Sequence, residues 1–290
     1  MKLIDGKALA NTIKGEIAEE VKILKKKGAK TPHLAAVLVG EDPASKVYVG
    51  GKVKDCEQVG FASTLIKKEA DTTEAELLEI VERLNQNDDI DGFIVQLPLP
   101  KHIDEEKITL AINPKKDVDG FHPMNLGRMT LGLPSYLPAT PYGIMQMLDR
   151  YDIETSGKHC VVVGRSNIVG TPMSILLSRK AKVGNCTVTL THSRTKELAE
   201  ETKRADIIIA AIGRPNFITA DMVKEGVVVI DVGVNRVEDT SRKRGYRLVG
   251  DVDFEQVAPK CSFITPVPGG VGPMTRTSLL LNTLEAAKGK

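Results

Sequence analysis

The chain has 290 residues, of which 41% are hydrophobic and 27% charged, and its formal net charge is +2. This composition is typical of a globular protein with one large domain or two ordinary ones. The small net charge argues against a nucleic-acid or membrane-surface partner. No apolar run reaches the length of a membrane span, and the N-terminus lacks the apolar core of a signal peptide.

The four cysteines are scattered and show no spacing typical of metal ligands. Two of them lie within or beside apolar runs, so buried free thiols are the better interpretation. Free thiols persist in a reducing compartment. We therefore expect the protein to be cytoplasmic. Its four cysteines, Cys56, Cys160, Cys186 and Cys261, are expected to be free thiols.

Strands and helices alternate along the first part of the chain. Apolar periodicity and turn residues predict helices over 9–24, from 43 onward and over 73–85, and strands over 33–39, 61–67 and 91–96. Pro43 suits the first turn of a helix, and that helix carries Tyr48 and Lys52 one turn apart on one side. The alternation predicts a parallel sheet.

Residues 113–138 differ, being rich in Gly, Pro and Asn with little periodicity. This segment is the natural boundary between two lobes. Thr140 and Pro141 are expected to cap a helix that runs to about Arg150 and bridges the lobes.

The second part of the chain is organised around a glycine turn. A buried strand over 160–163 precedes the turn 164–170, and Pro172 suits the start of the next helix. This geometry can place a diphosphate against a helix N-terminus. The fingerprint is imperfect, because Ser166 replaces the middle glycine and Gly170 comes one residue late, so an ordinary tight turn stays an alternative.

Further strands are predicted over 187–191, 206–210, 227–230 and 262–265, and a final helix over 275–288. A dinucleotide site for NAD usually has an acid at the end of its second strand. Here that position reads Thr191-His-Ser-Arg-Thr195, which has none. Arg165, Ser193 and Arg194 could hold a 2′-phosphate instead, which favours NADP. The alternative is that these arginines are simply solvated on loops.

Chemistry in the first lobe depends on a few polar residues. An isolated lysine such as Lys52 is usually solvated, but the neighbouring Tyr48 ring could stack on a flat heterocycle while the amine reaches its reacting edge. Gln96 ends a strand where such folds place ligand groups. Asp117 and Asp119 either cap their own turn or accept N–H bonds from an amino-pyrimidine.

The segment Pro266-Val-Pro-Gly-Gly-Val-Gly-Pro-Met-Thr275 is the least ordinary in the chain. Its prolines stiffen the backbone, and its glycines remove side chains from it. We expect a loop that lines something flat.

Five segments together resemble one family. They are Tyr48-Val-Gly-Gly-Lys52, Asp91-Gly-Phe-Ile-Val-Gln-Leu-Pro-Leu-Pro100, Lys116-Asp-Val-Asp-Gly120, Gly164-Arg-Ser-Asn-Ile-Val-Gly170 and the 266–275 segment. In this order they are similar to methylenetetrahydrofolate dehydrogenase/methenyltetrahydrofolate cyclohydrolase in its bifunctional bacterial form. The resemblance covers essentially the whole chain.

The resemblance implies an α/β fold of two lobes with a cleft between them. The domains would be a catalytic, folate-binding domain over 1–138, a Rossmann-type NADP-binding domain over 139–275, and a C-terminal helix over 276–290 that packs back on the first. It also implies a homodimer formed through the nucleotide lobes, no metal, and oxidation of 5,10-methylenetetrahydrofolate to the methenyl form followed by hydrolysis to 10-formyltetrahydrofolate.

The resemblance also implies roles for individual residues. Lys52 would be the acid/base residue, Gln96 would orient it, Tyr48 would stack on the folate, Asp119 would anchor the pterin, and Ser45 would assist. The remaining implied residues are Pro268, Gly269 and Gly270 at the substrate, and Gly164, Arg165, Ser166, Ser193, Arg194, Gly213 and Gly233 at NADP.

Three rival hypotheses are weaker. A dehydrogenase without the hydrolytic step is disfavoured by the intact set of Tyr48, Lys52 and Gln96. A two-lobed dehydrogenase for a small acid does not suit the 266–275 segment. A non-catalytic nucleotide sensor is disfavoured because both sets of residues are intact. One departure from the family is the segment 181–186, which looks longer than usual and is expected to be a surface loop near the cofactor lobe.

Overall fold

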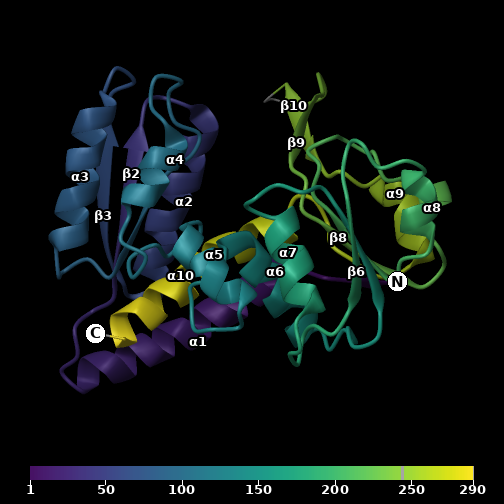
Figure 1. Cartoon of the computed structure of the whole chain (residues 1–290), viewed down its shortest axis with the longest axis horizontal. Coiled ribbons are helices and arrows are strands. Elements are labelled where there is room, and N and C mark those ends of the chain that lie inside the picture. The colour runs from purple at the N-terminus through teal and green to yellow at the C-terminus, as the bar shows by residue number, and fades with distance from the viewer. Residues whose placement is uncertain (243–244, 290) are drawn as a thin grey trace. The chain divides into compact units, whose positions relative to one another are not determined.

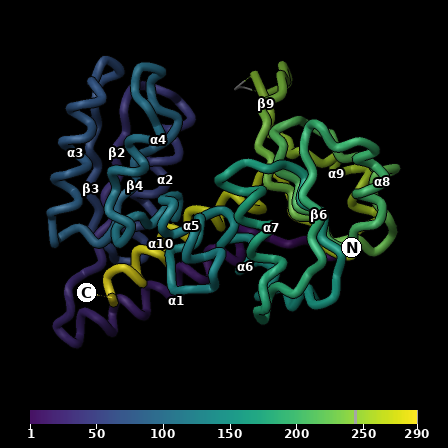
Figure 2. The backbone as a smooth tube through the Cα atoms, in the orientation of Figure 1, coloured from purple at the N-terminus to yellow at the C-terminus, as the bar shows by residue number. Residues whose placement is uncertain are grey.

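The computed structural model describes residues 1–242 and 245–289. Its contacts divide the chain into two compact units. The three-stranded unit comprises Asn11–Ala139 and Arg276–Lys290, and the six-stranded unit comprises Met1–Ala10 and Thr140–Thr275. Figures 1 and 2 follow the chain through both. The domain boundaries predicted from the sequence placed the first ten residues differently.

The three-stranded unit contains a parallel sheet in the order β3-β2-β4, made of β2 (His33–Val39), β3 (Ala62–Lys68) and β4 (Gly92–Val95). Figure 2 shows these strands as neighbours in the backbone trace. Its helices are α2 (Pro43–Val59), α3 (Glu74–Gln86), α4 (Glu105–Ala111), α5 (Pro123–Thr130), and most of α1 (Gly6–Lys26) and α10 (Val271–Lys288).

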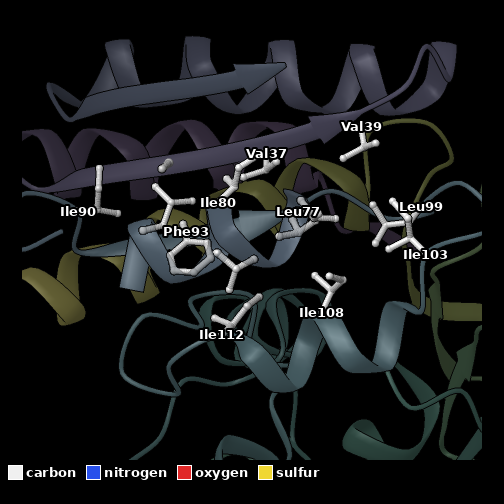
Figure 3. Packing of buried hydrophobic residues seen from close by; sticks show 14 residues of the cluster. Val37, Val39, Leu77, Ile80, Ile90, Phe93, Leu99, Ile103, Ile108 and Ile112 are labelled. Atoms are coloured by element: carbon white, nitrogen blue, oxygen red, sulfur yellow. The ribbon is translucent and has the colours of Figure 1, made fainter. Parts of the chain in front are cut away.

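The core of this unit follows from strand alternation. Ala35, Val37 and Val39 of β2 point to one face of the sheet, where they join Phe93 of β4 in a buried cluster. Helices α3 and α4 supply the other side of this cluster, with buried Leu77, Ile80, Val81, Leu84 and Ile108. Figure 3 shows the Phe93 ring packed among these aliphatic side chains. Burying each large side chain stabilises the fold by about 1.5–3 kcal/mol.

The six-stranded unit contains a sheet in the order β1-β11-β8-β7-β5-β6, with every neighbouring pair parallel. Its strands are β1 (Lys2–Leu3), β5 (His159–Val163), β6 (Thr187–Thr191), β7 (Ile207–Ala210), β8 (Val227–Asp231) and β11 (Cys261–Ile264). Each residue of β7 and β8 is buried, as expected for parallel strands covered on both faces.

The other elements of this unit are short. They are α6 (Ala139–Arg150), α7 (Gly170–Ser178), α8 (Leu198–Lys203), α9 (Phe254–Val257) and the antiparallel pair β9 (Asn235–Glu238) and β10 (Tyr246–Val249). Single 3₁₀ turns lie at Ala220–Met222 and Ala258–Lys260. No helix within the described ranges is long and apolar enough to span a bilayer.

One sequence-based expectation was wrong in part. Helix α10 begins at Val271, so half of the segment expected to be a loop is helical, with Pro273 tolerated in the first turn. The boundary segment 113–138 contains a helix, α5, which follows the His122 cap. The free, buried state expected of the four cysteines is confirmed.

The last helix is tied to the three-stranded unit by its polar side chains. Asn282 donates from Nδ2 to the carbonyl oxygens of Val118 and Leu137, at 2.8 and 2.9 Å. Lys288 forms an ion pair with Glu20 at 2.6 Å.

Candidate active site

Helix α2 positions three of the expected site residues. The Asp42 carboxylate accepts from the Ser45 backbone N–H at 2.7 Å and Pro43 opens the first turn, so the helix begins at a defined residue. Ser45 is buried beside this cap. Tyr48 follows one turn later and is 45% exposed, an unusual state for a tyrosine that leaves its ring face available to a flat ligand.

Lys52 and Gln96 meet in the structure. Gln96 follows the last residue of β4, and its backbone N–H donates to the Val37 carbonyl at 2.9 Å, which continues the pairing with β2. Its side-chain amide donates to its neighbour's carbonyl, that of Leu97, at 2.7 Å. This bond turns Oε1 of Gln96 toward Lys52, whose Nζ donates to it at 3.0 Å.

The surroundings of Lys52 make its charged form less favourable than in water. Burial lowers the pKa of Lys52, Asp119 opposes that shift, and the Arg276 guanidinium adds to it. Burial raises the pKa of Asp119, and the nearby Lys52 ammonium opposes that shift. A lysine whose charge is penalised in this way can act as a base nearer neutral pH.

Asp117 has a structural task. Its carboxylate accepts from the backbone N–H groups of Gly120, Phe121 and His122, at 3.1, 3.3 and 2.8 Å, and from Nδ2 of Asn125 at 2.8 Å. This is the turn-capping role that the sequence left open for either aspartate. Asp119 is the one that lies near Lys52.

The glycine turn after β5 is shaped by two close approaches. A side chain at Gly170 would collide with the carbonyl group of Gly164, and one at Gly164, where φ is +118°, would collide with the Ala211 carbonyl. The turn therefore folds tightly against the start of α7, as a dinucleotide turn does. Ser166 supports it, since its hydroxyl oxygen accepts from the N–H groups of Val169 and Gly170 at 3.2 and 3.4 Å.

The strand order also favours a ligand at this turn. Strand β5 lies between β6 and β7, so the chain passes from β5 to β6 on one side and then returns past β5 to β7 on the other. Such a change of direction is the switch point where open α/β sheets bind ligands. Arg165 in the turn, and Ser193 and Arg194 after β6, are exposed. Three exposed polar side chains at these positions could form hydrogen bonds to the phosphate groups of a dinucleotide.

The 181–186 segment lies at the opposite end of β6 from Arg194. Gly157 donates to the carbonyl of Asn185 at 3.0 Å, and Cys186 donates to the carbonyl of Leu177 at 2.9 Å, both at the amino ends of the strands. The expected surface loop is therefore hydrogen-bonded at the amino ends of β5 and β6, whereas the glycine turn follows the carboxyl end of β5.

Two buried carboxylates that sequence reasoning missed hold the loops after β7 and β8. Asp251 accepts from the N–H groups of Ile212, Gly213 and Arg214, at 2.7–2.9 Å. Asp231 accepts from the N–H groups of Gly233 and Asp251, at 3.1 and 2.9 Å. The N–H groups of Gly213 and Gly233 are thus already paired, so these glycines would shape a cofactor site without donating to it. The sequence offered one signal for this arrangement, the aspartate at the end of the apolar strand β8, Asp231.

The proline–glycine loop belongs to the six-stranded unit. The carbonyl of Gly269 accepts from the Lys7 backbone N–H at 2.9 Å, and a side chain at Gly6 would collide with the Gly270 carbonyl. The first turn of α1 therefore packs directly on this loop. The peptide bond before Pro268 is cis.

A cavity of about 460 Å³ adjoins the carboxyl ends of β8 and β11 in the same unit. It is bordered by Asp231, Arg247, Phe254 and Pro266. None of the residues expected to hold the dinucleotide phosphates lines it.

Both parts of the chain match models of one family. Residues 4–119 match the catalytic domain of tetrahydrofolate dehydrogenase/cyclohydrolase, and residues 138–290 match its NAD(P)-binding domain. The chain belongs to the tetrahydrofolate dehydrogenase/cyclohydrolase family. The resemblance noted in the sequence is thereby confirmed, as is the mixed α/β fold with a catalytic and a nucleotide-binding domain.

Relatives within the tetrahydrofolate dehydrogenase/cyclohydrolase family are similar along their whole length. The bifunctional protein FolD of Cytophaga hutchinsonii is 64% identical over 287 residues, which are 99% of each chain. That of Bacteroides thetaiotaomicron is 62% identical over 288 residues, 99% of this chain and 98% of the relative.

Solved structures of the same family agree with the fold. The bifunctional FolD enzyme of Campylobacter jejuni is 48% identical, with a TM-score of 0.93 over 100% of this chain and 99% of that one. The Trypanosoma brucei enzyme, solved with NADP and an inhibitor, is 37% identical, with a TM-score of 0.94 over 99% of this chain and 97% of that one.

Proposed function

We propose that this protein oxidises 5,10-methylenetetrahydrofolate to 5,10-methenyltetrahydrofolate with NADP, and then hydrolyses the product to 10-formyltetrahydrofolate. It is a bifunctional dehydrogenase and cyclohydrolase of one-carbon folate metabolism. NADP, when bound, supplies the hydride acceptor. The oxidation asks no side chain to give or take a proton, so the protein's part is to bind and orient.

The observation that carries the hydrolytic step is the hydrogen bond between Lys52 and Gln96. Water adds to the methenyl carbon, the bond from that carbon to N5 breaks, and N5 gains a proton. Lys52 in its neutral form would take one proton from the attacking water and return it to N5 as the bond to that nitrogen breaks. The second proton of the water is released to solvent as the added hydroxyl becomes the formyl carbonyl. Gln96 would orient the amine for both transfers.

The remaining site residues would bind the folate. Tyr48 would stack on the flat ring system, since its ring is exposed on the same side of α2 as Lys52. Asp119 would accept N–H bonds from the amino-pyrimidine edge, and Ser45 would assist at the start of α2. Pro268, Gly269 and Gly270 would border the substrate with a backbone free of large side chains.

NADP would be held at the carboxyl ends of the strands of the six-stranded unit. The tight turn at Gly164, shaped further by Ser166, would hold the diphosphate at the start of α7. Arg165, Ser193 and Arg194 would bind the 2′-phosphate, since the residues directly after β6, 192–195, include no acid to bind a free ribose hydroxyl. Gly213 and Gly233 would leave room for the rest of the dinucleotide.

The activity is tested by mixing the pure protein with 5,10-methylenetetrahydrofolate and either NADP or NAD. NADPH and methenyl absorbance are followed separately. NADP-dependent reduction with little methenyl accumulating, and with 10-formyltetrahydrofolate as the end product, supports both steps. Reduction with methenyl decaying no faster than without protein would leave a dehydrogenase alone. No reduction with either nucleotide would leave a nucleotide-sensing protein.

We also propose a homodimer formed through the six-stranded units, located in the cytoplasm. The family resemblance supports the dimer, and the four buried free thiols suit a reducing compartment. Light scattering coupled to size exclusion measures the first, and fractionation of the source cells measures the second. A monomeric mass, or recovery outside the cytoplasm, would contradict the respective proposal.

A further inference from the structure

A buried ion network lies on α2 about one helical turn after Lys52. Asp55 lies on α2 three residues after Lys52, and its carboxyl side chain is only 8% exposed. Its Oδ1 pairs with the Lys14 ammonium at 3.1 Å, and its Oδ2 pairs with Nε of Arg276 at 2.9 Å. Lys14 also donates to Oε1 of Gln58 at 2.8 Å. One carboxylate therefore joins α1, α2 and α10.

Arg276 lies against the backbone of the turn that carries Lys52. A side chain at Gly51 would collide with the Arg276 guanidinium, so only a glycine there lets the cation come this close. Asp55 binds the guanidinium from the next turn of α2, because Gly51 and Asp55 are four residues apart and therefore neighbours on the helix surface. Arg276 is thus held against the turn of α2 that carries Lys52, by a salt bridge to Asp55 and by close packing on Gly51.

The charges of this network do not cancel. Two cations, Lys14 and Arg276, share the single negative charge of Asp55, and of the two it is Arg276 that acts electrostatically on Lys52. Arginine stays protonated at any working pH. The groups that act on Lys52 from the packed elements are this guanidinium on α10, the Asp119 carboxylate, and the neutral amide of Gln96.

We infer that Arg276 is a positioning residue for the hydrolytic step: fixed by Asp55 and packed against Gly51, its guanidinium disfavours the ammonium form of Lys52 and so favours the neutral form that can accept a proton. This inference rests on the proposed role of Lys52 as the acid/base residue. A fixed like charge disfavours the ammonium form of its neighbour, and it keeps doing so before the cationic substrate arrives. The Asp119 carboxylate favours the ammonium form of Lys52, so Asp119 and Arg276 shift the pKa of Lys52 in opposite directions.

The test replaces each cation of the network in turn. Arg276→Met removes the charge beside Lys52 and keeps an unbranched chain, with Asp55 still paired to Lys14. Lys14→Met is the matched control, since it breaks the same buried network from the side that does not act on Lys52. Arg276→Lys restores the charge, and Arg276→Gln is a second neutral variant should the first fold poorly.

The readout is the pH dependence of acetylation of Lys52 by acetic anhydride, measured by peptide mass spectrometry in the whole protein. Exposed Lys54 on the same helix is the internal reference. We expect the Lys52 curve to move to higher pH in Arg276→Met and Arg276→Gln, and to stay in place in Lys14→Met and Arg276→Lys. An unmoved curve in both neutral variants, or an equal shift in Lys14→Met, overturns the inference.

A second readout is the pH–rate profile of methenyltetrahydrofolate hydrolysis. On its acidic limb the Arg276→Met rate should fall roughly threefold to tenfold, while near the alkaline plateau it should approach that of the wild type. A fall of equal size at every pH overturns the inference, because it would reflect lost structure. The two hypotheses separate cleanly: absence of hydrolysis in the wild type counts against the proposed function, whereas the acetylation curves judge Arg276 without any activity.

Discussion

The Lys52 ammonium nitrogen lies 3.0 Å from the side-chain oxygen of Gln96, across a hydrogen bond that joins a helix to the end of a strand. Gln96 cannot turn freely, because its amide nitrogen is bonded to the Leu97 carbonyl at 2.7 Å. The orientation of the Lys52 amine is therefore fixed by Gln96, whose own side chain is held by the Leu97 carbonyl. Such a pair suits a group that must take up a proton and return it while its amine keeps one orientation.

Lys52→Met should separate the two activities. The change removes the amine and keeps the apolar stem, so hydrolysis should lose roughly 100- to 10,000-fold, the usual contribution of a positioned acid/base group. The oxidation needs no proton transfer, and methenyltetrahydrofolate should accumulate in the coupled assay. Lys54→Met, an exposed change on the same helix, is the control and should leave both rates in place. Equal losses in both steps would contradict the role assigned to Lys52.

The two aspartates of the 117–120 turn should fail in different ways. Asp117→Ala removes the carboxylate that accepts from the backbone N–H groups of Phe121 and His122 and shares that of Gly120, so the free energy of unfolding should fall by roughly 2–4 kcal/mol. Asp119→Asn should keep the stability and raise the folate KM. Urea unfolding and steady-state kinetics measure the two effects. Loss of stability in Asp119→Asn without a change in KM would reverse the assignment.

The choice of nucleotide should depend on the exposed arginines. The double change Arg165→Ala and Arg194→Ala removes two charge-assisted contacts to a 2′-phosphate, each worth about 1.5–3 kcal/mol. The KM for NADP should rise by at least about tenfold, and the KM for NAD should change little. Arg204→Ala, which breaks only a surface pair with Glu201, is the control. A parallel rise in both KM values would point to a general defect in the turn.

Stability of the six-stranded unit should depend on pH through Asp231. Burial raises the pKa of Asp231 to about 7, and the Asp251 carboxylate adds to the shift. The folded chain thus holds this proton more tightly than the unfolded chain, whose pKa is about 4. The stability contribution is complete below pH 4 and is lost as the pH rises through 7, a difference on the order of 4 kcal/mol.

Asp231→Asn should remove this dependence. The advantage of the wild type over the variant should shrink between pH 5 and pH 8 in thermal unfolding. Asp152→Asn, at an exposed position of the same unit with a positive φ that asparagine tolerates, is the control and should follow the wild type. A constant difference across the range would mean that Asp231 is ionised in the folded protein throughout.

The elements that carry the chemistry were predictable because their signals are local. Pro43 marked the start of α2, and the apolar runs of β2 and β5 gave strands that end within a residue of the observed bounds. The meeting of Lys52 with Gln96 came only from the family resemblance, since no local pattern joins residues 44 positions apart.

The features that sequence reasoning missed depend on distant contacts. Strand β1 has two residues and exists only by pairing with β11. Helix α5 is capped by His122 through its ring nitrogen, which is outside the usual set of cap residues. Arg276 was not singled out from the sequence, because its partner Asp55 is remote along the chain. Burial and pairing, which decide these cases, cannot be read from a single window of sequence.

The pairing of β1 with β11 also bears on when the protein can finish folding. Lys2 lies beside Phe263 and Leu3 beside Ile264, so the two edges of this ladder are about 260 residues apart along the chain. During synthesis the first residues must wait for almost the whole polypeptide before their strand has a neighbour. A fragment that starts after residue 10 would leave β11 as a bare sheet edge, open to pairing with other molecules.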